Sequence, residues 1–313
     1  MPEPTPYPQL VITWEDVLTP GERIAAPSTE LDPFGRDSYP TPAPDLSFSL
    51  ELAEFLASQS LLIYGASESR TKVWDRLGLR ETLHTDGAHT HCSIVEAADG
   101  RGAALVVFRG TTHLKHWLTN LQSIPTEWSG GGHVHSGFAD AHQEVWHRIR
   151  PRLREIADGG RALILTGHSL GAALATLSLS SLIAEGAGPA CAYTFGSPRV
   201  GNTQFAISLE TARLFRFVNH DDLVTRYPLP FKPSRRLSFH HAGAAYYLDG
   251  SRVLHPRGPG DLEEESSSVS QLASLATDAL PAASESRPPG PLADHAPLAY
   301  WYGLHTTPEL GAT

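Results

Sequence analysis

A serine between two glycines is the clearest chemical signal in this 313-residue sequence. Ser169 is the middle residue of G-H-S-L-G at residues 167–171, after an apolar run at 163–165 and before a leucine-rich stretch of small residues. A strand that turns tightly into a helix projects such a serine above the sheet, and the close backbones require small residues two positions to either side. We interpret Ser169 as a nucleophile, with the first amides of the helix directed at a developing oxyanion. The alternative is an ordinary glycine loop between a buried strand and a buried helix.

A serine hydroxyl attacks only with a base in hydrogen-bond reach and an acid that orients the base. Asp221 and Asp222 directly follow an apolar run at 215–218, which is where an open α/β sheet assembles its site. The expected chain order places the histidine after them. The later histidines are His220, His240, His241, His255, His295 and His305.

Apolar periodicity predicts the elements that must position these residues. Strands and helices alternate along most of the chain, which favours a mainly parallel sheet with right-handed crossovers. Ser47 is the expected N-cap of the first helix. The helices are expected at 47–62, 137–157 and 204–209, and the strands at 91–97, 103–108, 163–166, 191–195, 214–218 and 239–248.

Two segments differ in composition from this pattern. Residues 1–44 are rich in proline and are expected to form an irregular extension, packed across the domain by Trp14 and Phe34. Residues 256–291 are rich in Ser, Glu, Ala, Pro and Gly and are expected to form an insertion, with a short helix at 269–280. The remainder, 45–313, is expected to be one domain.

Composition excludes several classes of partner. The net charge of −10 argues against nucleic acid, and no run of 18 apolar residues predicts a transmembrane helix. The N-terminus has no basic and apolar leader, so a cytoplasmic location is the default expectation, with secretion by another route left open. Cys92 and Cys191 are expected to be free thiols. The sequence does not fix the oligomeric state.

Clusters of histidine raise the possibility of a metal site. His89, His91 and Cys92 lie close in the sequence, as do His133 and His135. Spacing of two places side chains on one face of a strand, which suits a pair of ligands, but no third or fourth ligand is evident. We therefore expect no metal and no cofactor.

Beyond these patterns, the chain resembles the class 3 (fungal-type) lipases from about residue 104 to 248 and again at 293–300. The segments that carry the resemblance are V-F-R-G-T at 107–111, H-V-H-S-G-F at 133–138, G-H-S-L-G-A-A-L-A at 167–175, T-F-G-S-P-R-V-G-N at 194–202, the acid loop at 219–228, H-A-G at 241–243 with Y-Y at 246–247, and D-H at 294–295 with Tyr300. Thr225 stands where the acid loop of the family usually has proline.

This resemblance implies an α/β-hydrolase fold, with a mainly parallel central sheet, helices on both faces and a helical lid over the active site. It implies Ser169 as nucleophile, Asp222 as orienting acid and His295 as base. It also implies an oxyanion hole made by the backbone N–H groups of Leu170 and Thr111. The long insertion separates His295 from the preceding strand, and His241 is the rival base.

A lid is also indicated by periodicity. Leu114, Trp117, Leu118 and Leu121 have the spacing of one apolar helix face, and the first three are candidate acyl-binding residues. In a lipase such a face covers the site in water and turns outward on an oil surface. The alternative is a helix packed permanently on the core.

Together these residues favour a serine carboxylic-ester hydrolase. A triacylglycerol lipase that cleaves acylglycerols through an acyl-enzyme on Ser169 is the leading hypothesis, with a lipid or ester substrate at a lipid–water interface. Phospholipase A1 and short-chain or feruloyl esterases share the same triad. A non-catalytic lipase-like protein that binds a lipid or a partner is the alternative from another class.

Overall fold

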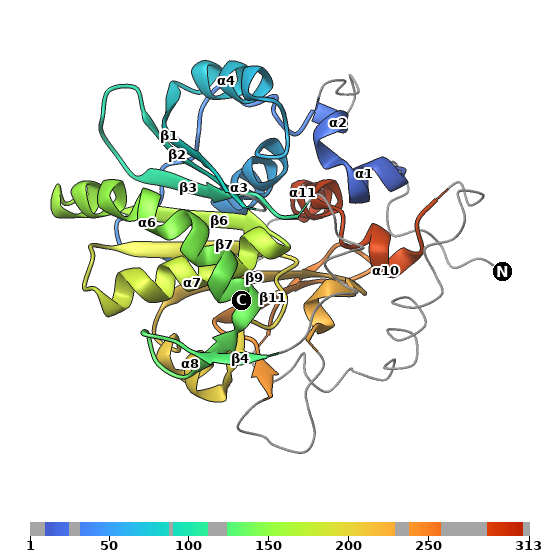
Figure 1. Cartoon of the computed structure of the whole chain (residues 1–313). Helices are drawn as coiled ribbons and strands as arrows, with labels where there is room; N and C mark the ends of the chain where they lie inside the picture. The colour runs from blue at the N-terminus through green and yellow to red at the C-terminus, as the bar shows by residue number, and fades with distance from the viewer. Residues whose placement is uncertain are drawn as a thin grey trace.

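A large mixed sheet forms the centre of the protein in the computed structural model, which describes residues 10–24, 32–87, 90–111, 124–228, 238–257 and 287–308 (Figure 1). The strand order is β1-β2-β3-β6-β7-β9-β11-β12. The strands are β1 Leu79–Asp86, β2 His91–Ala97, β3 Ala104–Phe108, β6 Leu163–His168, β7 Ala190–Phe195, β9 Arg213–Asn219, β11 Ala244–Leu248 and β12 Leu254–Arg257.

The five inner strands from β3 to β11 run parallel, whereas β1, β2 and β12 are antiparallel to their neighbours. Parallel strands bring their carboxyl ends to one edge of the sheet, where an open α/β fold assembles its site. The predicted α/β fold with a mainly parallel sheet is therefore confirmed.

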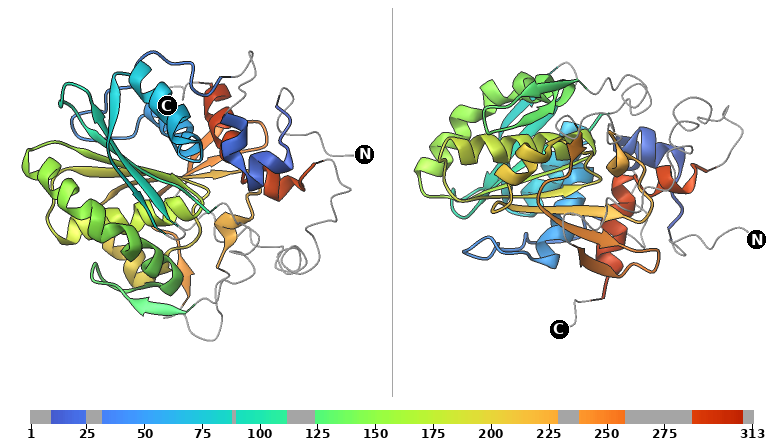
Figure 2. Two further views of the ribbon diagram at one scale, coloured as in Figure 1. Left: turned by 45° about the horizontal axis from the view of Figure 1, so that its top comes forward. Right: turned by 90° about the horizontal axis from the view of Figure 1, so that it is seen from below.

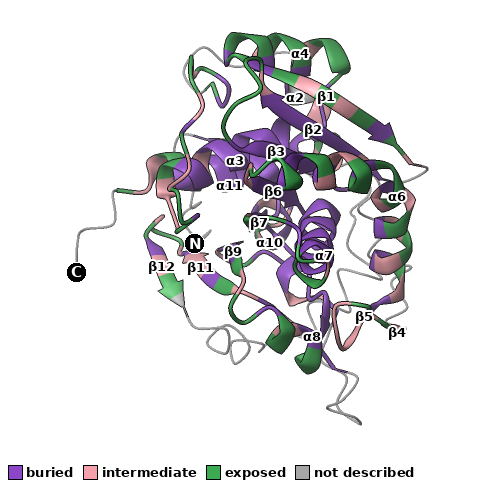
Figure 3. Cartoon of the chain, turned by 90° about the vertical axis from the view of Figure 1, so that its left-hand side faces the viewer, coloured by how far each residue is buried: buried purple, intermediate pink, exposed green. Residues whose placement is uncertain are grey.

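Helices cover both faces of the sheet (Figure 2). α3 Leu50–Leu62 and α11 Pro297–Thr306 pack together on one face, while α6 Ser136–Asp158 and α7 Leu170–Ala184 pack on the other. Side chains of β3 alternate between the two cores, with Leu105 and Val107 facing α3 and Val106 facing α7. Figure 3 shows α7 buried along nearly its whole length, which explains its small and apolar sequence.

A small antiparallel sheet lies beside the main one, with strand order β10-β8-β5-β4. Its strands are β4 Pro125–Glu127, β5 His133–His135, β8 Gly201–Asn202 and β10 Phe239–His240. α8 Thr203–Ser208 follows β8, and the Asn202 side chain caps it by accepting the Phe205 N–H at 3.0 Å. The sequence predicted α8 within a residue but not this sheet, because strands of two or three residues give no periodicity.

The N-terminal extension is not irregular as expected, because it holds two short helices, α1 Trp14–Leu18 and α2 Pro20–Ile24. Thr13 and Asp16 form a capping box that satisfies free amides at the start of α1. Val17 and Phe34 are buried in the core shared with α3, while Trp14 is half-buried. The described parts of the extension, residues 10–24 and 32–44, therefore contribute to the core.

Three further expectations about elements need correction. Ser49 rather than Ser47 is the N-cap of α3, since its hydroxyl accepts the Leu52 N–H at 3.2 Å. The strand expected at 239–248 is two strands in different sheets, because Gly243 turns the chain with a φ of 79°. α4 Ser67–Arg76 and β1 were not predicted; β1 is an edge strand with alternating exposure and few apolar residues.

The proposed lid residues and most of the insertion lie outside the described residues, as does the helix expected at 269–280. The insertion's described ends are regular, with β12 before it and α10 Gly290–Ala293 after it. None of the described helices is long and apolar enough to span a bilayer.

Gly171 at the start of α7 provides a test of the packing between α7 and β3. A Cβ at this position would lie 2.3 Å from the Phe108 carbonyl oxygen, so the backbones must separate. We expect Gly171→Ala to lower the free energy of unfolding by about 1–3 kcal/mol in urea denaturation. Gly290→Ala is the matched control, because its Cβ would meet nothing within 4 Å, and it should change stability by less than about 0.5 kcal/mol. Equal effects would contradict the close approach.

Candidate active site

Ser169 occupies the turn between β6 and α7 with φ 58° and ψ −124°, a conformation that a non-glycine residue rarely adopts. The turn is tight, since a Cβ on Gly167 would lie 2.4 Å from the backbone of Gly171. The Ser169 N–H donates to the Phe195 carbonyl at 2.9 Å, which ties the turn to the end of β7. This is the strained strand-to-helix turn that the pentapeptide predicts.

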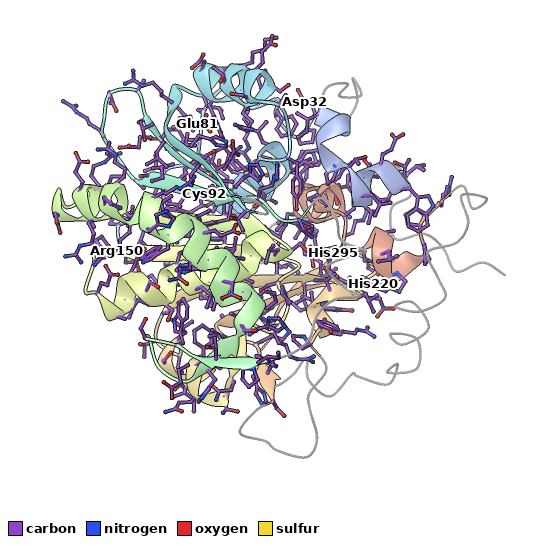
Figure 4. The ribbon with its side chains drawn as sticks, viewed as in Figure 1. Asp32, Glu81, Cys92, Arg150, His220 and His295 are labelled. Atoms are coloured by element: carbon purple, nitrogen blue, oxygen red, sulfur yellow. The ribbon has the colours of Figure 1, made fainter. Side chains whose placement is uncertain are left out.

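Asp222 and His295 meet beside this turn. Figure 4 labels His295 in its place in the fold. Asp222 follows β9 and is fully buried, while His295 lies between α10 and α11 and is 2 % exposed. His295 Nδ1 lies 3.0 and 2.9 Å from the two carboxylate oxygens of Asp222. Because a carboxylate accepts, Nδ1 carries the proton, so the Nε2 of a neutral ring presents its lone pair.

Two more donors fix the Asp222 carboxylate. The Tyr300 hydroxyl donates to Oδ2 at 2.6 Å, and the Val224 N–H donates to Oδ1 at 2.8 Å. Tyr300 is itself fixed, because its oxygen accepts the Asn219 N–H at 3.1 Å. A buried carboxylate is tolerated only when it is paired and hydrogen-bonded, and these donors satisfy that condition.

Gly196 lies where the serine turn meets the acid and the histidine. Its φ is 61°, and a Cβ here would lie 2.9 Å from Asp222 Oδ2 and 3.0 Å from His295 Nδ1. Gly196 also directly follows Phe195, the residue that holds Ser169. Ser169 Oγ and His295 Nε2 are both buried and have no hydrogen-bond partner among the described residues.

The two expected oxyanion donors flank the serine. Leu170 is the first residue of α7, so its N–H has no partner within the helix. Thr111 is half-buried and follows Gly110, whose Cβ would lie 3.3 Å from the Ser169 Cβ. The end of β3 therefore runs beside the serine turn. Leu114, Trp117 and Leu118 lie outside the described residues, so their relation to this site stays a prediction.

Part of the chain is similar to a family of known proteins. Residues 105–232 match the family model of lipase (class 3). A secreted mono- and diacylglycerol lipase 1 from Fusarium solani is 33% identical over 171 residues, which cover 52% of this chain and 50% of that protein. Residues 105–232 belong to the class 3 lipase family.

Another relative of this region is named for a different activity. A phospholipase A1-II 1 from Oryza sativa subsp. indica is 26% identical over 191 residues, covering 52% of this chain and 47% of that protein. The crystal structure of a mono- and diacylglycerol lipase from Aspergillus oryzae shares the fold, with a TM-score of 0.54 and 23% identity over 64% of this chain and 80% of that one. The chain spans about half the length of the curated relatives it matches.

The Fusarium solani relative is named as secreted, so the comparisons do not support the cytoplasmic location expected from the sequence.

A chain of hydrogen bonds beneath this site was not predicted. His168 Nε2 lies 2.6 Å from the His295 carbonyl, so it must carry the proton and donate. Burial lowers the pKa of His168 well below its usual value, and a proton gained by His295 would lower it further. The ring is therefore neutral, and its Nδ1 accepts from the Tyr64 hydroxyl at 3.1 Å. The Gly110 N–H donates to Tyr64, which links the end of β3 to the histidine loop.

Tyr64 had no signal in the sequence, because it lies two residues after α3 and joins the site only through tertiary packing. His168 could have been noticed as the residue beside the serine, but its direction depends on the turn. The glycine at 196 was visible within the motif at 194–202, although its role in admitting His295 was not.

The rival candidates lie elsewhere. His241 Nε2 donates to the Thr225 carbonyl at 2.7 Å, on the acid loop, and has no contact with the Asp222 carboxylate among the described residues. The Asp221 carboxylate accepts from Arg226 at 2.6 Å and is exposed. His255 also contacts an acid, Asp249, at 2.8 Å, but that pair is partly exposed, whereas the pair of Asp222 and His295 is buried.

His241 provides a test of how buried imidazole affects stability. Burial lowers its pKa well below the usual 6.5, and the nearby charges of Arg216 and Arg199 lower it further. Below about pH 6.5 the unfolded chain binds a proton that the folded chain refuses, so stability is full above this pH and is lost as pH falls. The free energy of unfolding falls by up to about 1.4 kcal/mol per pH unit for each such histidine.

We expect His241→Gln, which keeps a donor for Thr225, to reduce the loss of unfolding free energy between about pH 7.5 and about pH 5.5. Urea denaturation at both pH values measures this loss of unfolding free energy. His147→Gln, at an exposed position on α6, should leave the pH dependence unchanged. Identical slopes for wild type and His241→Gln would show that this histidine does not titrate as its burial requires.

Proposed function

We propose that this protein is a serine carboxylic-ester hydrolase that works through an acyl-enzyme. The observation that carries the proposal is the buried hydrogen bond between Asp222 and His295, which leaves Nε2 without a partner beside the serine turn. A neutral imidazole held in this tautomer is the base that a serine nucleophile needs.

The proposed reaction proceeds in two steps. Ser169 Oγ attacks the ester carbonyl while His295 Nε2 takes its proton, and the Asp222 carboxylate stabilises the imidazolium that forms. The backbone N–H groups of Leu170 and Thr111 hold the negative oxygen of the tetrahedral intermediate. His295 then protonates the departing alcohol, and a water molecule that loses its proton to the same nitrogen releases the acid and restores the serine.

Acylglycerols are the proposed substrates. A Fusarium solani relative and an Aspergillus oryzae structural neighbour are named mono- and diacylglycerol lipases, and a Rhizomucor miehei relative is named lipase. The apolar spacing of Leu114, Trp117 and Leu118 suits a lid that opens on a lipid surface. No cofactor takes part in the proposed reaction.

Phospholipase A1 activity is the second candidate, supported by the rice relative of that name. The two candidates differ in the head group beside the scissile ester. Fatty-acid release from diolein and from phosphatidylcholine vesicles, measured at equal enzyme concentration, distinguishes them. We expect faster release from diolein, and the reverse ratio would favour the phospholipase.

The serine and the substrate class can be tested together on p-nitrophenyl esters from acetate to palmitate. We expect wild-type activity to rise toward long acyl chains and to vanish in Ser169→Ala, because the acyl-enzyme cannot form. Activity confined to short chains would favour an esterase. No activity in the folded wild type would reject the catalytic proposal in favour of a lipid- or partner-binding protein.

Adjacent aspartates provide a matched pair for testing the acid. Asp222→Asn removes the charge that stabilises the imidazolium and allows the wrong tautomer, so kcat should fall by about 10⁴-fold. Asp221→Asn alters an exposed carboxylate one residue away, and we expect it to change kcat less than about twofold. Circular dichroism checks that both variants fold. Comparable losses in both would contradict the proposed role of Asp222.

A further inference from the structure

A second cluster of reactive side chains lies on the hairpin of β1 and β2, outside the proposed active site. In the antiparallel register Asp86 pairs directly with His91, and His84 lies two residues before Asp86 on the same strand. Residues two apart on a strand face the same side, as do directly opposed residues, so the backbone brings these three side chains together. The cluster was not expected because β1 was not predicted.

The three potential ligand atoms converge on a small volume. His84 Nε2 lies 3.0 Å from Asp86 Oδ1, and His91 Nδ1 contacts the same oxygen. One atom from each residue lies within 4.8 Å of the others. Ligands bound to one metal ion at about 2.0–2.2 Å must lie this close to one another.

His84 is oriented from behind by two other side chains. Its Nδ1 lies 3.0 Å from Ser93 Oγ and 3.4 Å from Glu81 Oε1, while the Ser93 hydroxyl donates to Glu81 at 2.5 Å. Nδ1–H is therefore a donor, and without a metal Nε2–H donates to Asp86 as well, so a bound cation would replace the proton on Nε2. A carboxylate that orients a histidine in this way is the usual outer layer of a metal site. Figure 4 shows Glu81 at this end of the sheet.

The charges around the cluster are mixed, because the positive charges of Arg70 and Arg109 act on His84 and His91, while Asp86 and Glu81 supply negative charge. Arg148 donates to the backbone carbonyl of Asp86 at 3.0 Å and to Thr85, rather than to the carboxylate. Within the described ranges no arginine or lysine pairs with the Asp86 carboxylate, whose side chain is 59% exposed. The carboxylate thus keeps its negative charge for a ligand, and solvent can complete the coordination.

We propose that His84, Asp86 and His91 bind a divalent cation of the zinc class. Two imidazole nitrogens and one carboxylate oxygen with a water molecule match the four-coordinate preference of Zn²⁺, whereas Ca²⁺ requires six to eight oxygens. Cys92 is no ligand, because it is fully buried in the core on the opposite face of β2. His89 lies outside the described residues and is not part of the proposal.

The bound ion would stabilise the hairpin next to the proposed oxyanion segment. The His91 carbonyl accepts the Arg109 N–H at 2.9 Å, and Arg109 is followed by Gly110 and Thr111. A metal that crosslinks the two strands at His91 therefore holds the end of β3 in place. Its role is structural, so its effect is read in stability and binding rather than in the chemical step.

The test uses the full chain, treated with EDTA, dialysed and titrated with ZnCl₂ in a calorimeter. We expect one Zn²⁺ per chain, a Tm that rises with Zn²⁺, and far weaker binding of CaCl₂. Asp86→Asn and His84→Ala should abolish both the binding and the rise in Tm, and Ser93→Ala should weaken binding by about 10–100-fold. His147→Ala, at an exposed histidine away from the hairpin, is the matched control.

The proposal is overturned if the folded wild type binds no Zn²⁺, or if Asp86→Asn binds it as tightly as wild type does. Preference for Ca²⁺ over Zn²⁺ would also overturn it. If His84→Ala does not fold, Zn²⁺ binding by Asp86→Asn alone decides the test. Asp86 is exposed and asparagine has the same shape, so this variant should keep the fold. None of these readouts requires ester hydrolysis, so the metal site and the proposed function can fail independently.

Discussion

The buried carboxylate of Asp222 constrains the architecture around it more than any other group. A charge removed from water must be met by donors, and here the donors come from three parts of the chain: His295, Tyr300 and the backbone of Val224. His295 and Tyr300 reach it from the turn before α11 and from α11 itself, so packing of α11 against α3 and the sheet sets their positions. The interaction that orients the base thus also fastens the C-terminal helix to the carboxyl end of β9.

The second constraint on the site is that backbone segments must approach one another closely. The Ser169 N–H is hydrogen-bonded to the end of β7, and Asp222 follows β9. His295 can approach Asp222 only because residue 196 lacks a side chain. The same applies at Gly110, which places the end of β3 against the serine turn. Parallel strands place their carboxyl ends at one edge of the sheet, so these segments meet at that edge. α7 begins at the same edge, and its first backbone N–H groups have no partner within the helix. Fold and site are therefore two consequences of one strand arrangement.

The sequence predicted what depends on local pattern and missed what depends on distant packing. β2 was predicted at its observed bounds and β3 within a residue, since each is an apolar run ended by turn residues. β1 was missed because an edge strand with exposed side chains lacks that signal, and with it the grouping of His84 with His91. Tyr64 illustrates the same limit, since only the packing of α3 brings its hydroxyl to His168. Motif resemblance supplied the candidate triad, which periodicity alone left open among several acids and histidines.

Labelling with a fluorophosphonate followed by peptide mass mapping shows whether Ser169 is a nucleophile, because this reagent reacts with an activated serine. We expect a single adduct, on the peptide that contains Ser169. We also expect His295→Gln to slow labelling by orders of magnitude and His241→Gln not to, since the His295 Nε2 is buried without a partner whereas the His241 Nε2 donates to the Thr225 carbonyl. No adduct on the folded wild type, or loss of labelling in His241→Gln with full labelling in His295→Gln, would contradict it.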